Sequence, residues 1–76
     1  PFNPSTQIEF EVIDREYIEL DIYDILGNRI ETLCKGYYEK GNHIVTFDGE
    51  DCESGIYFCK LSSKNQNVVK KMILAK

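Results

Sequence analysis

The sequence has few of the residues from which metal and redox sites are built. It contains three cysteines, Cys34, Cys52 and Cys59, and a single histidine, His43. The cysteines are odd in number and lack the C-x-x-C spacing of zinc sites, which argues against a metal or any other cofactor. A disulfide between two of them stays open, but unpaired thiols packed in the core are favoured, since cysteine is a good small core residue.

The sequence also lacks a long apolar run, a glycine-rich phosphate loop and acidic residues near its end. No apolar run approaches the ~20 residues of a membrane-spanning helix, so we expect a soluble domain. Residues 60–76 contain five lysines and no acid, whereas residues 1–59 contain all 13 acids and four bases. An acidic body, and lysines without interleaved aromatic residues, argue against nucleic-acid binding.

The length of 76 residues predicts one small domain. Such a domain buries only about 60% of its unfolded surface and has little room for a deep cleft, so we expect no small-molecule substrate. Strand-forming residues far outnumber Ala and Leu, which predicts a mainly β chain. Because the chain opens at Pro1 rather than Met, we expect a fragment of a longer parent protein, with residues 1–5 as a linker and residues 6–76 as the folded domain.

The strand expected to organise the fold begins at residue 17. Ile18, Leu20 and Ile22 alternate with residues that include Glu19 and Asp21. Alternation with a period of two places the aliphatic side chains on one face and the carboxylates on the other. This segment is therefore predicted to be a half-buried strand.

The same alternation predicts further strands and the turns between them. The other expected strands cover residues 6–12, 28–34, 43–47, 56–61 and 68–74. Asp24 is expected to cap the turn after the organising strand, and Gly27 to take a positive φ there. Ile30 and Leu33 are out of step by one residue, which indicates a bulge or a strand end. Residues 35–42 lie between two glycines and are expected to form a loop.

The last two strands differ in character. Residues 56–61 are apolar on both faces, as in a central strand, whereas Lys70 and Lys71 place one charge on each face of residues 68–74. Such charges are typical of an edge strand, because they discourage another chain from adding to the sheet. Six or seven short strands at this spacing predict an all-β fold, an immunoglobulin-like antiparallel β-sandwich.

No combination of residues predicts a catalytic site, so we do not expect an enzyme. His43 falls on the inward face of its strand and is expected to be packed and hydrogen-bonded. The acidic cluster at residues 48–53 could bind calcium, but it lacks the alternate ligand spacing of calcium loops, and a solvated loop is favoured.

Five short motifs follow one another in the order found in a known family. They are Phe2-Asn3-Pro4-Ser5-Thr6, Ile22-Tyr23-Asp24-Ile25-Leu26-Gly27, Gly41-Asn42-His43, Ser54-Gly55-Ile56-Tyr57-Phe58 and Lys70-Lys71-Met72-Ile73-Leu74. Together they resemble the type A C-terminal sorting domain of the type IX secretion system, over nearly the whole chain. The pattern is also similar to the immunoglobulin-like domain of flagellar hook-capping proteins, which carries a longer insert before the Ser-Gly-x-Tyr strand.

This resemblance implies a non-catalytic domain that sorts and anchors a parent protein at the bacterial cell surface. The route implied runs through the periplasm of a Gram-negative-type bacterium. The partners implied are the outer-membrane secretion machinery, a sortase-like surface protease and the N-terminal cargo domains of the parent. The candidate signal residues are Gly55, Tyr57, Lys71 and Lys76. For two of these residues, a requirement of the fold is an alternative explanation: Gly55 for its backbone geometry and Tyr57 for its packing.

Two other functions stay open at this point. One is an immunoglobulin-like spacer or assembly module, which resembles the hook-capping domain and needs no secretion machinery. The other is carbohydrate binding through Tyr37 and Tyr38, which depends on both aromatic side chains being exposed on a loop.

Overall fold

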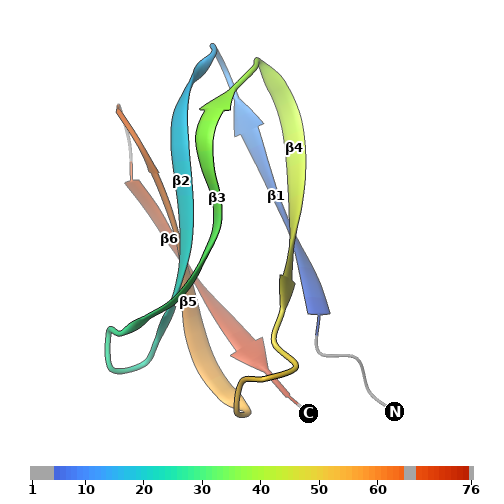
Figure 1. Ribbon diagram of the computed structural model, residues 1–76, viewed down its shortest axis with the longest axis vertical. Helices are drawn as coiled ribbons and strands as arrows, with labels where there is room; N and C mark the ends of the chain where they lie inside the picture. Colours follow the sequence, from blue (N-terminus) through green and yellow to red (C-terminus); the bar gives the residue numbers. More distant parts are fainter. Residues whose placement is uncertain (1–4, 65–66, 76) are drawn as a thin grey trace.

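The computed structural model describes residues 5–64 and 67–75 and is built from β-strands (Figure 1). The strands are β1 (Ser5–Val12), β2 (Glu16–Asp24), β3 (Arg29–Tyr38), β4 (Gly41–Asp48), β5 (Gly55–Ser63) and β6 (Asn67–Leu74). Among the described residues, no helix is long and apolar enough to cross a membrane. β1 begins at Ser5, within the predicted linker, and residues 1–4 lie outside the described residues.

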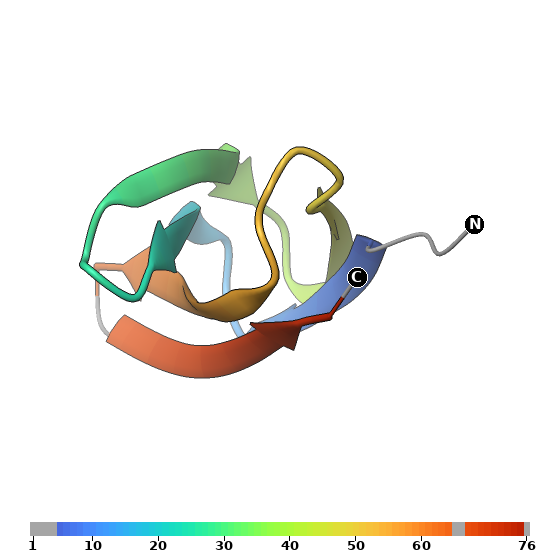
Figure 2. The ribbon, with the colours of Figure 1, turned by 90° about the horizontal axis from the view of Figure 1, so that it is seen from below.

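The strands form two antiparallel sheets that pack face to face, which confirms the predicted β-sandwich. One sheet has the order β1-β4 and the other the order β3-β2-β5-β6. Figure 2 looks along the molecule and shows the two layers on either side of the core. In an immunoglobulin sandwich, strands B and E pair in one sheet and strands C, F and G in the other, with C′ added beside C in the variable type. The order of the six strands matches this pattern. Within the described ranges, nothing occupies the place of the first immunoglobulin strand beyond β1.

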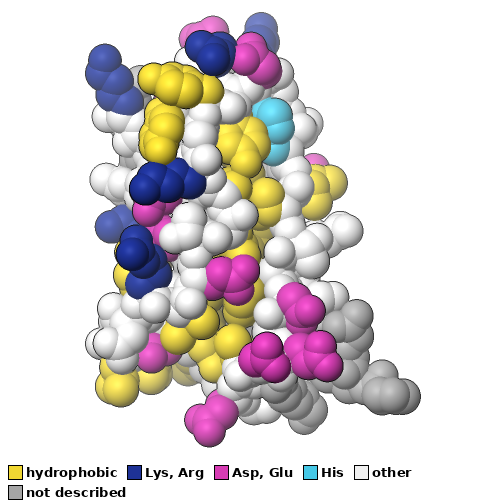
Figure 3. All heavy atoms as spheres, in the orientation of Figure 1, with side chains coloured by type: hydrophobic (Ala, Val, Ile, Leu, Met, Phe, Trp, Pro, Cys, Tyr) yellow, Lys and Arg dark blue, Asp and Glu magenta, His cyan; other side chains and the backbone are white. Residues whose placement is uncertain are grey.

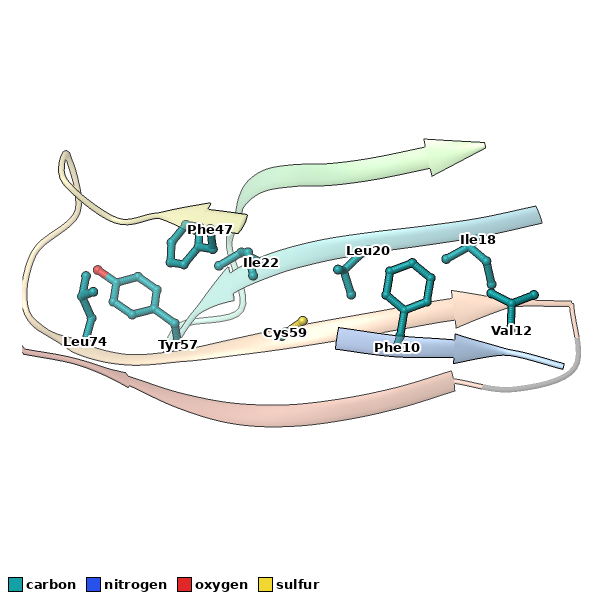
Figure 4. Close-up of a cluster of buried hydrophobic side chains, with 9 residues drawn as sticks. All are labelled: Phe10, Val12, Ile18, Leu20, Ile22, Phe47, Tyr57, Cys59 and Leu74. Carbon is teal, nitrogen blue, oxygen red and sulfur yellow. The ribbon is translucent and has the colours of Figure 1, made fainter. Parts of the chain in front are cut away.

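β2 is the strand around which the core is built, as the alternation predicts. It pairs with β3 on one side and with β5 on the other. Ile18, Leu20 and Ile22 are 3%, 1% and 0% exposed. Burial of each such side chain contributes roughly 1.5 to 3 kcal/mol, as an upper estimate. The other buried hydrophobic residues are Phe10, Val12, Phe47, Tyr57, Cys59 and Leu74 (Figure 4).

The opposite face of β2 is less exposed than the alternation predicts. Asp21 points away from the core, as expected, but it is only 3% exposed. It lies opposite Thr32 on β3 and Lys60 on β5, and the Thr32 hydroxyl donates a hydrogen bond of 2.6 Å to its carboxylate. The strand was predicted to be half-buried, but at this position its outer face is buried as well. In a central strand, both neighbouring strands cover the outer face, here with the hydrogen-bonded Thr32 on β3 and the longer side chain of Lys60 on β5.

The turn after β2 has the predicted geometry. The carboxylate of Asp24 accepts hydrogen bonds of 2.9 Å from the backbone N–H groups of Leu26 and Asn28. Gly27 has a φ of +88°, a conformation that a residue with a Cβ resists. The hydrogen bonds, above all the one from the Asn28 backbone, lower the pKa of Asp24, because they favour its charged form.

The segment after this turn departs from the prediction. Residues 35–42 do not form a loop, because β3 continues to Tyr38 and β4 begins at Gly41. Pairing with β2 overrides the local glycine signal, and Gly36 lies opposite Ile18 in the ladder. The predicted irregularity is confirmed, since the β2–β3 register shifts where β3 carries Leu33 and again where it carries Ile30.

Candidate recognition surface beside the last strand

Three of the four candidate signal residues meet at one corner of the larger sheet. Gly55 at the start of β5 pairs with Leu74 near the end of β6, and Tyr57 pairs with Met72. Lys71 follows on β6, directly opposite Phe58. Lys76 lies outside the described residues.

Gly55 and Tyr57 support the fold at this corner. Gly55 has a φ of +156°, in a region that is essentially restricted to glycine. Tyr57 is 8% exposed, and its hydroxyl donates a hydrogen bond of 2.6 Å to the backbone carbonyl of Glu53. Its ring lies 6.5 Å from that of Phe47 on the opposite sheet. Burial raises the pKa of Tyr57, with a smaller contribution from nearby Cys52. Both structural explanations therefore have direct support in the contacts.

Lys71 is placed differently, on the solvent side of the sheet. It is exposed, and its neighbours on the same face of β6 are Val69 and Ile73, which are 58% and 74% exposed. β6 is an edge strand, as predicted, because it lies at the end of the sheet order and pairs with β5 alone among the described strands. A single ammonium group therefore lies within an exposed apolar row.

This row continues across β5 to the turn after β2. Ile56 pairs with Ile73 in the ladder, and a surface hollow of about 290 Å³ joins Ile25 of the turn to Phe58 and Val69. A second hollow of about 420 Å³ is lined by Ile25, Leu26 and Ile56, and also by the acidic residues Asp24, Asp51 and Glu53. We call these side chains the outer apolar surface, namely Ile25, Leu26, Ile56, Phe58, Val69 and Ile73.

Two residues of the outer apolar surface lie in the turn after β2, and one of them, Leu26, is the most exposed of the six. Ile25 and Leu26 are 64% and 83% exposed. Figure 3 shows hydrophobic side chains gathered at the end of the molecule where the β2–β3 turn lies. Turns usually carry polar residues, so two adjacent aliphatics between Asp24 and Gly27 were the signal in the sequence that could have indicated this surface.

The histidine is packed and hydrogen-bonded, as predicted. His43 Nε2 lies 2.7 Å from the backbone carbonyl of Glu39. The imidazole stacks on Phe10, with ring centroids 5.5 Å apart, and meets Tyr38 edge-on at 5.0 Å. The ring is half-buried, and these three contacts hold it against aromatic side chains at the edge of the core.

The cysteines are present as free thiols, which agrees with the favoured prediction. Cys59 is buried, whereas Cys34 and Cys52 are half-buried against the core. Burial raises the pKa of the Cys59 thiol, with a further contribution from Cys34. A hydrogen bond with Cys34 is the main cause of the raised pKa of Tyr38.

The acidic cluster forms an exposed connection between β4 and β5. Its carboxylates gather at the lower right of Figure 3, and Asp48, Asp51 and Glu53 are exposed. Asp48 accepts a hydrogen bond of 3.0 Å from the backbone N–H of Glu50, which closes a local turn. In the part of the chain that the structure describes, no group of three His, Cys, Asp or Glu residues could hold a metal ion.

The pair of tyrosines proposed for carbohydrate binding is split between two faces of β3. Tyr37 is 65% exposed, with its ring beneath the Arg15 guanidinium at 4.7 Å and edge-on to Tyr17 at 5.3 Å. Tyr38 is half-buried and packs edge-on against Phe10 at 5.6 Å. The expectation of two exposed aromatics on a loop is therefore wrong.

Comparison with models of known protein families gives a match over nearly the whole chain. The family model described as "Secretion system C-terminal sorting domain" matches residues 1–75. No curated protein and no solved structure shows significant similarity to the chain. Sorting domains of this family act as signals for type IX secretion, and their parent proteins are secreted or attached to the cell surface. Since the match covers nearly the whole chain, the chain belongs to the family of secretion system C-terminal sorting domains.

Proposed function

We propose that the outer-membrane secretion machinery recognises the domain as a folded β-sandwich and binds it through the outer apolar surface and Lys71. The observation that carries this proposal is a single ammonium group inside an exposed apolar row. Val69 and Ile73, on either side of Lys71, are 58% and 74% exposed. Exposed apolar patches of this kind are typical of interaction sites, and the enclosed charge adds specificity.

The side chains of this surface indicate which chemical groups its partner should present. Apolar side chains along β5, β6 and the β2–β3 turn favour a partner with an apolar face of similar extent. Lys71 favours a carboxylate within that face, and excluding water from the surrounding row strengthens the attraction. Lys60 is half-buried on the same face of β5, but it lies opposite the carboxylate of Asp21, so Lys71 is the exposed ammonium group of this surface.

The four candidate signal residues have different roles in this proposal. Gly55 and Tyr57 hold the end of β5 in position and so shape the surface, whereas Lys71 contacts the partner. Lys76 is retained as a signal residue on the strength of the family resemblance. After export through the periplasm, a sortase-like surface protease removes the domain and anchors the cargo domains of the parent. The domain itself has no catalytic role.

A reporter fusion tests the proposal. The chain is fused to the C-terminus of a periplasmic fluorescent reporter in a bacterium that has a type IX secretion system. We expect the fusion to reach the cell surface or the medium, and the unfused reporter to stay in the periplasm. A folded fusion that stays in the periplasm would overturn the proposal.

A further inference from the structure

Two unpaired sheet edges lie on the same side of the molecule. Among the strands of the described residues, β1 pairs only with β4, and β6 pairs only with β5. The two strands run in opposite directions in Figure 1, and Figure 2 shows them close together on one side of the sandwich. Each edge presents a row of backbone N–H and C=O groups that can pair with another strand.

A groove separates these two edges and opens toward the core. Its largest part has a volume of about 450 Å³ and is lined by residues that include Thr6, Phe47 and Leu74. Two smaller parts, of about 240 and 60 Å³, are both lined by Glu9 of β1 and Lys70 of β6. Glu9 and Lys70 therefore lie at the same height along the sandwich, on opposite walls of the groove.

We propose that this open side binds a second copy of the chain, with β1 of each copy pairing antiparallel to β6 of the other. The two copies are related by a two-fold axis that runs parallel to the strands, between the layers. Rotation about this axis exchanges the layers, so β6 of the second copy arrives beside β1 of the first. Each joined sheet then has the strand order β4-β1-β6-β5-β2-β3, in which β4 and β1 come from one copy and the other four strands come from the second copy.

The rotation leaves heights along the axis unchanged, and this sets the register of the new pairs. Residues that face each other across the groove in one copy become neighbours between copies. Glu9 is exposed on the outer face of β1, and Lys71 is exposed on the outer face of β6. In the joined sheet, Glu9 of one copy and Lys71 of the other lie on the same face. Opposite charges that face each other directly or diagonally across a strand pair attract.

The same charges disfavour the alternative pairings of these edges. Pairing β1 with β1 would bring Glu9 and Glu11 of the two copies together, and pairing β6 with β6 would do the same for Lys70 and Lys71. Only the crossed arrangement joins the acidic edge to the basic edge. It also covers the half-buried side chains of Ile8 and Met72 along the groove.

Analytical ultracentrifugation of the purified chain, from micromolar to millimolar concentration, tests this inference. We expect a monomer–dimer equilibrium that weakens as salt is added, because surface charge pairs are screened. Glu9→Lys and Lys71→Glu should each raise the dissociation constant by about tenfold or more. The double variant should return it to within about threefold of the original value, because it restores an opposite-charge pair.

The matched control is Lys40→Glu, which makes the same change of charge in the exposed turn between β3 and β4. It should leave the dissociation constant unchanged. A chain that stays monomeric at millimolar concentration overturns the inference, and so does a dimer that the double variant fails to restore. Thermal melts show that each variant is folded. The result is independent of secretion, since it is measured on the purified chain.

Discussion

At the scale of single residues, Tyr57 and Lys71 are neighbours in the sheet but experience different environments. Tyr57 is 8% exposed and hydrogen-bonded to Glu53, whereas Lys71 is exposed to solvent. A substitution at Tyr57 therefore changes the packing of the fold together with any recognition. A substitution at Lys71 changes the charge of the surface and leaves the core intact, so it separates the two roles.

We predict that Lys71→Ala lowers export strongly and leaves stability nearly unchanged. Exposed side chains contribute little to folding, so the free energy of unfolding should shift by less than about 0.5 kcal/mol. Thermal melts and secretion of the reporter fusion provide the two measurements, with Lys40→Ala as the matched control. A large drop in melting temperature would make Lys71 structural, and normal export with a normal melt would remove it from the signal.

We predict that Gly49→Ala destabilises the domain through a direct clash. A Cβ at position 49 would lie 2.9 Å and 3.0 Å from the two terminal methyl groups of Leu74. The contacts are to the end of a flexible side chain, so movement of Leu74 relieves part of the overlap, and we expect a cost at the lower end of the roughly 1 to 3 kcal/mol that overpacking typically causes. Denaturant unfolding of Gly49→Ala, Leu74→Val and the double variant measures the coupling between the two sites. We expect the second substitution to recover part of the loss, and strictly additive effects would contradict the clash.

At the scale of strands and turns, the sequence predicts best where side-chain periodicity and burial agree. The alternation around Ile22 identifies β2 because a central strand buries one face completely. The glycines at 36 and 41 suggest a loop, but the ladder to β2 supplies partners for that backbone and β3 continues. Asp21 shows the same limit, since its burial depends on Thr32 and Lys60 from neighbouring strands, which local sequence does not reveal.

The turn after β2 leads to a prediction about pH. The pKa of Asp24 is lowered in the folded state, so its charge stabilises the fold at pH values above the ordinary pKa that this carboxyl has in the unfolded chain. This stabilisation is lost as the pH falls through the folded pKa. Thermal melts of the wild type and Asp24→Asn between neutral and acidic pH should converge at low pH. A gap between the melting temperatures that stays constant with pH would contradict the role of the charge.

At the scale of the whole molecule, the candidate surface was only partly predictable. Family motifs pointed to Gly55, Tyr57 and Lys71, and the structure brings these three to one corner. Ile25 and Leu26 were missed as parts of a surface because they meet β5 and β6 only after the sandwich has formed. The surface hollows combine residues of one turn with residues of two distant strands, and the sequence pattern alone does not show that these segments come together.

The whole sandwich is held together by its core, without a covalent cross-link among the described residues. Its three cysteines are free, and burial raises the pKa of Cys59, which keeps this thiol protonated and poorly reactive near neutral pH. We therefore predict the same melting temperature with and without a reductant. Thiol-reactive dye should label Cys59 more slowly than the half-buried Cys34 and Cys52 in the native state.

Unfolding the protein should release all three thiols for rapid labelling, because burial is what protects them. Peptide mapping after a short exposure to the dye identifies which cysteine has reacted, and denaturant supplies the control. A melting temperature that falls when reductant is added would show that a disulfide contributes to stability. Equal labelling rates for the three cysteines in the native state would show that the region around Cys59, between β2 and β6, opens more readily than the 7% exposure of this residue implies.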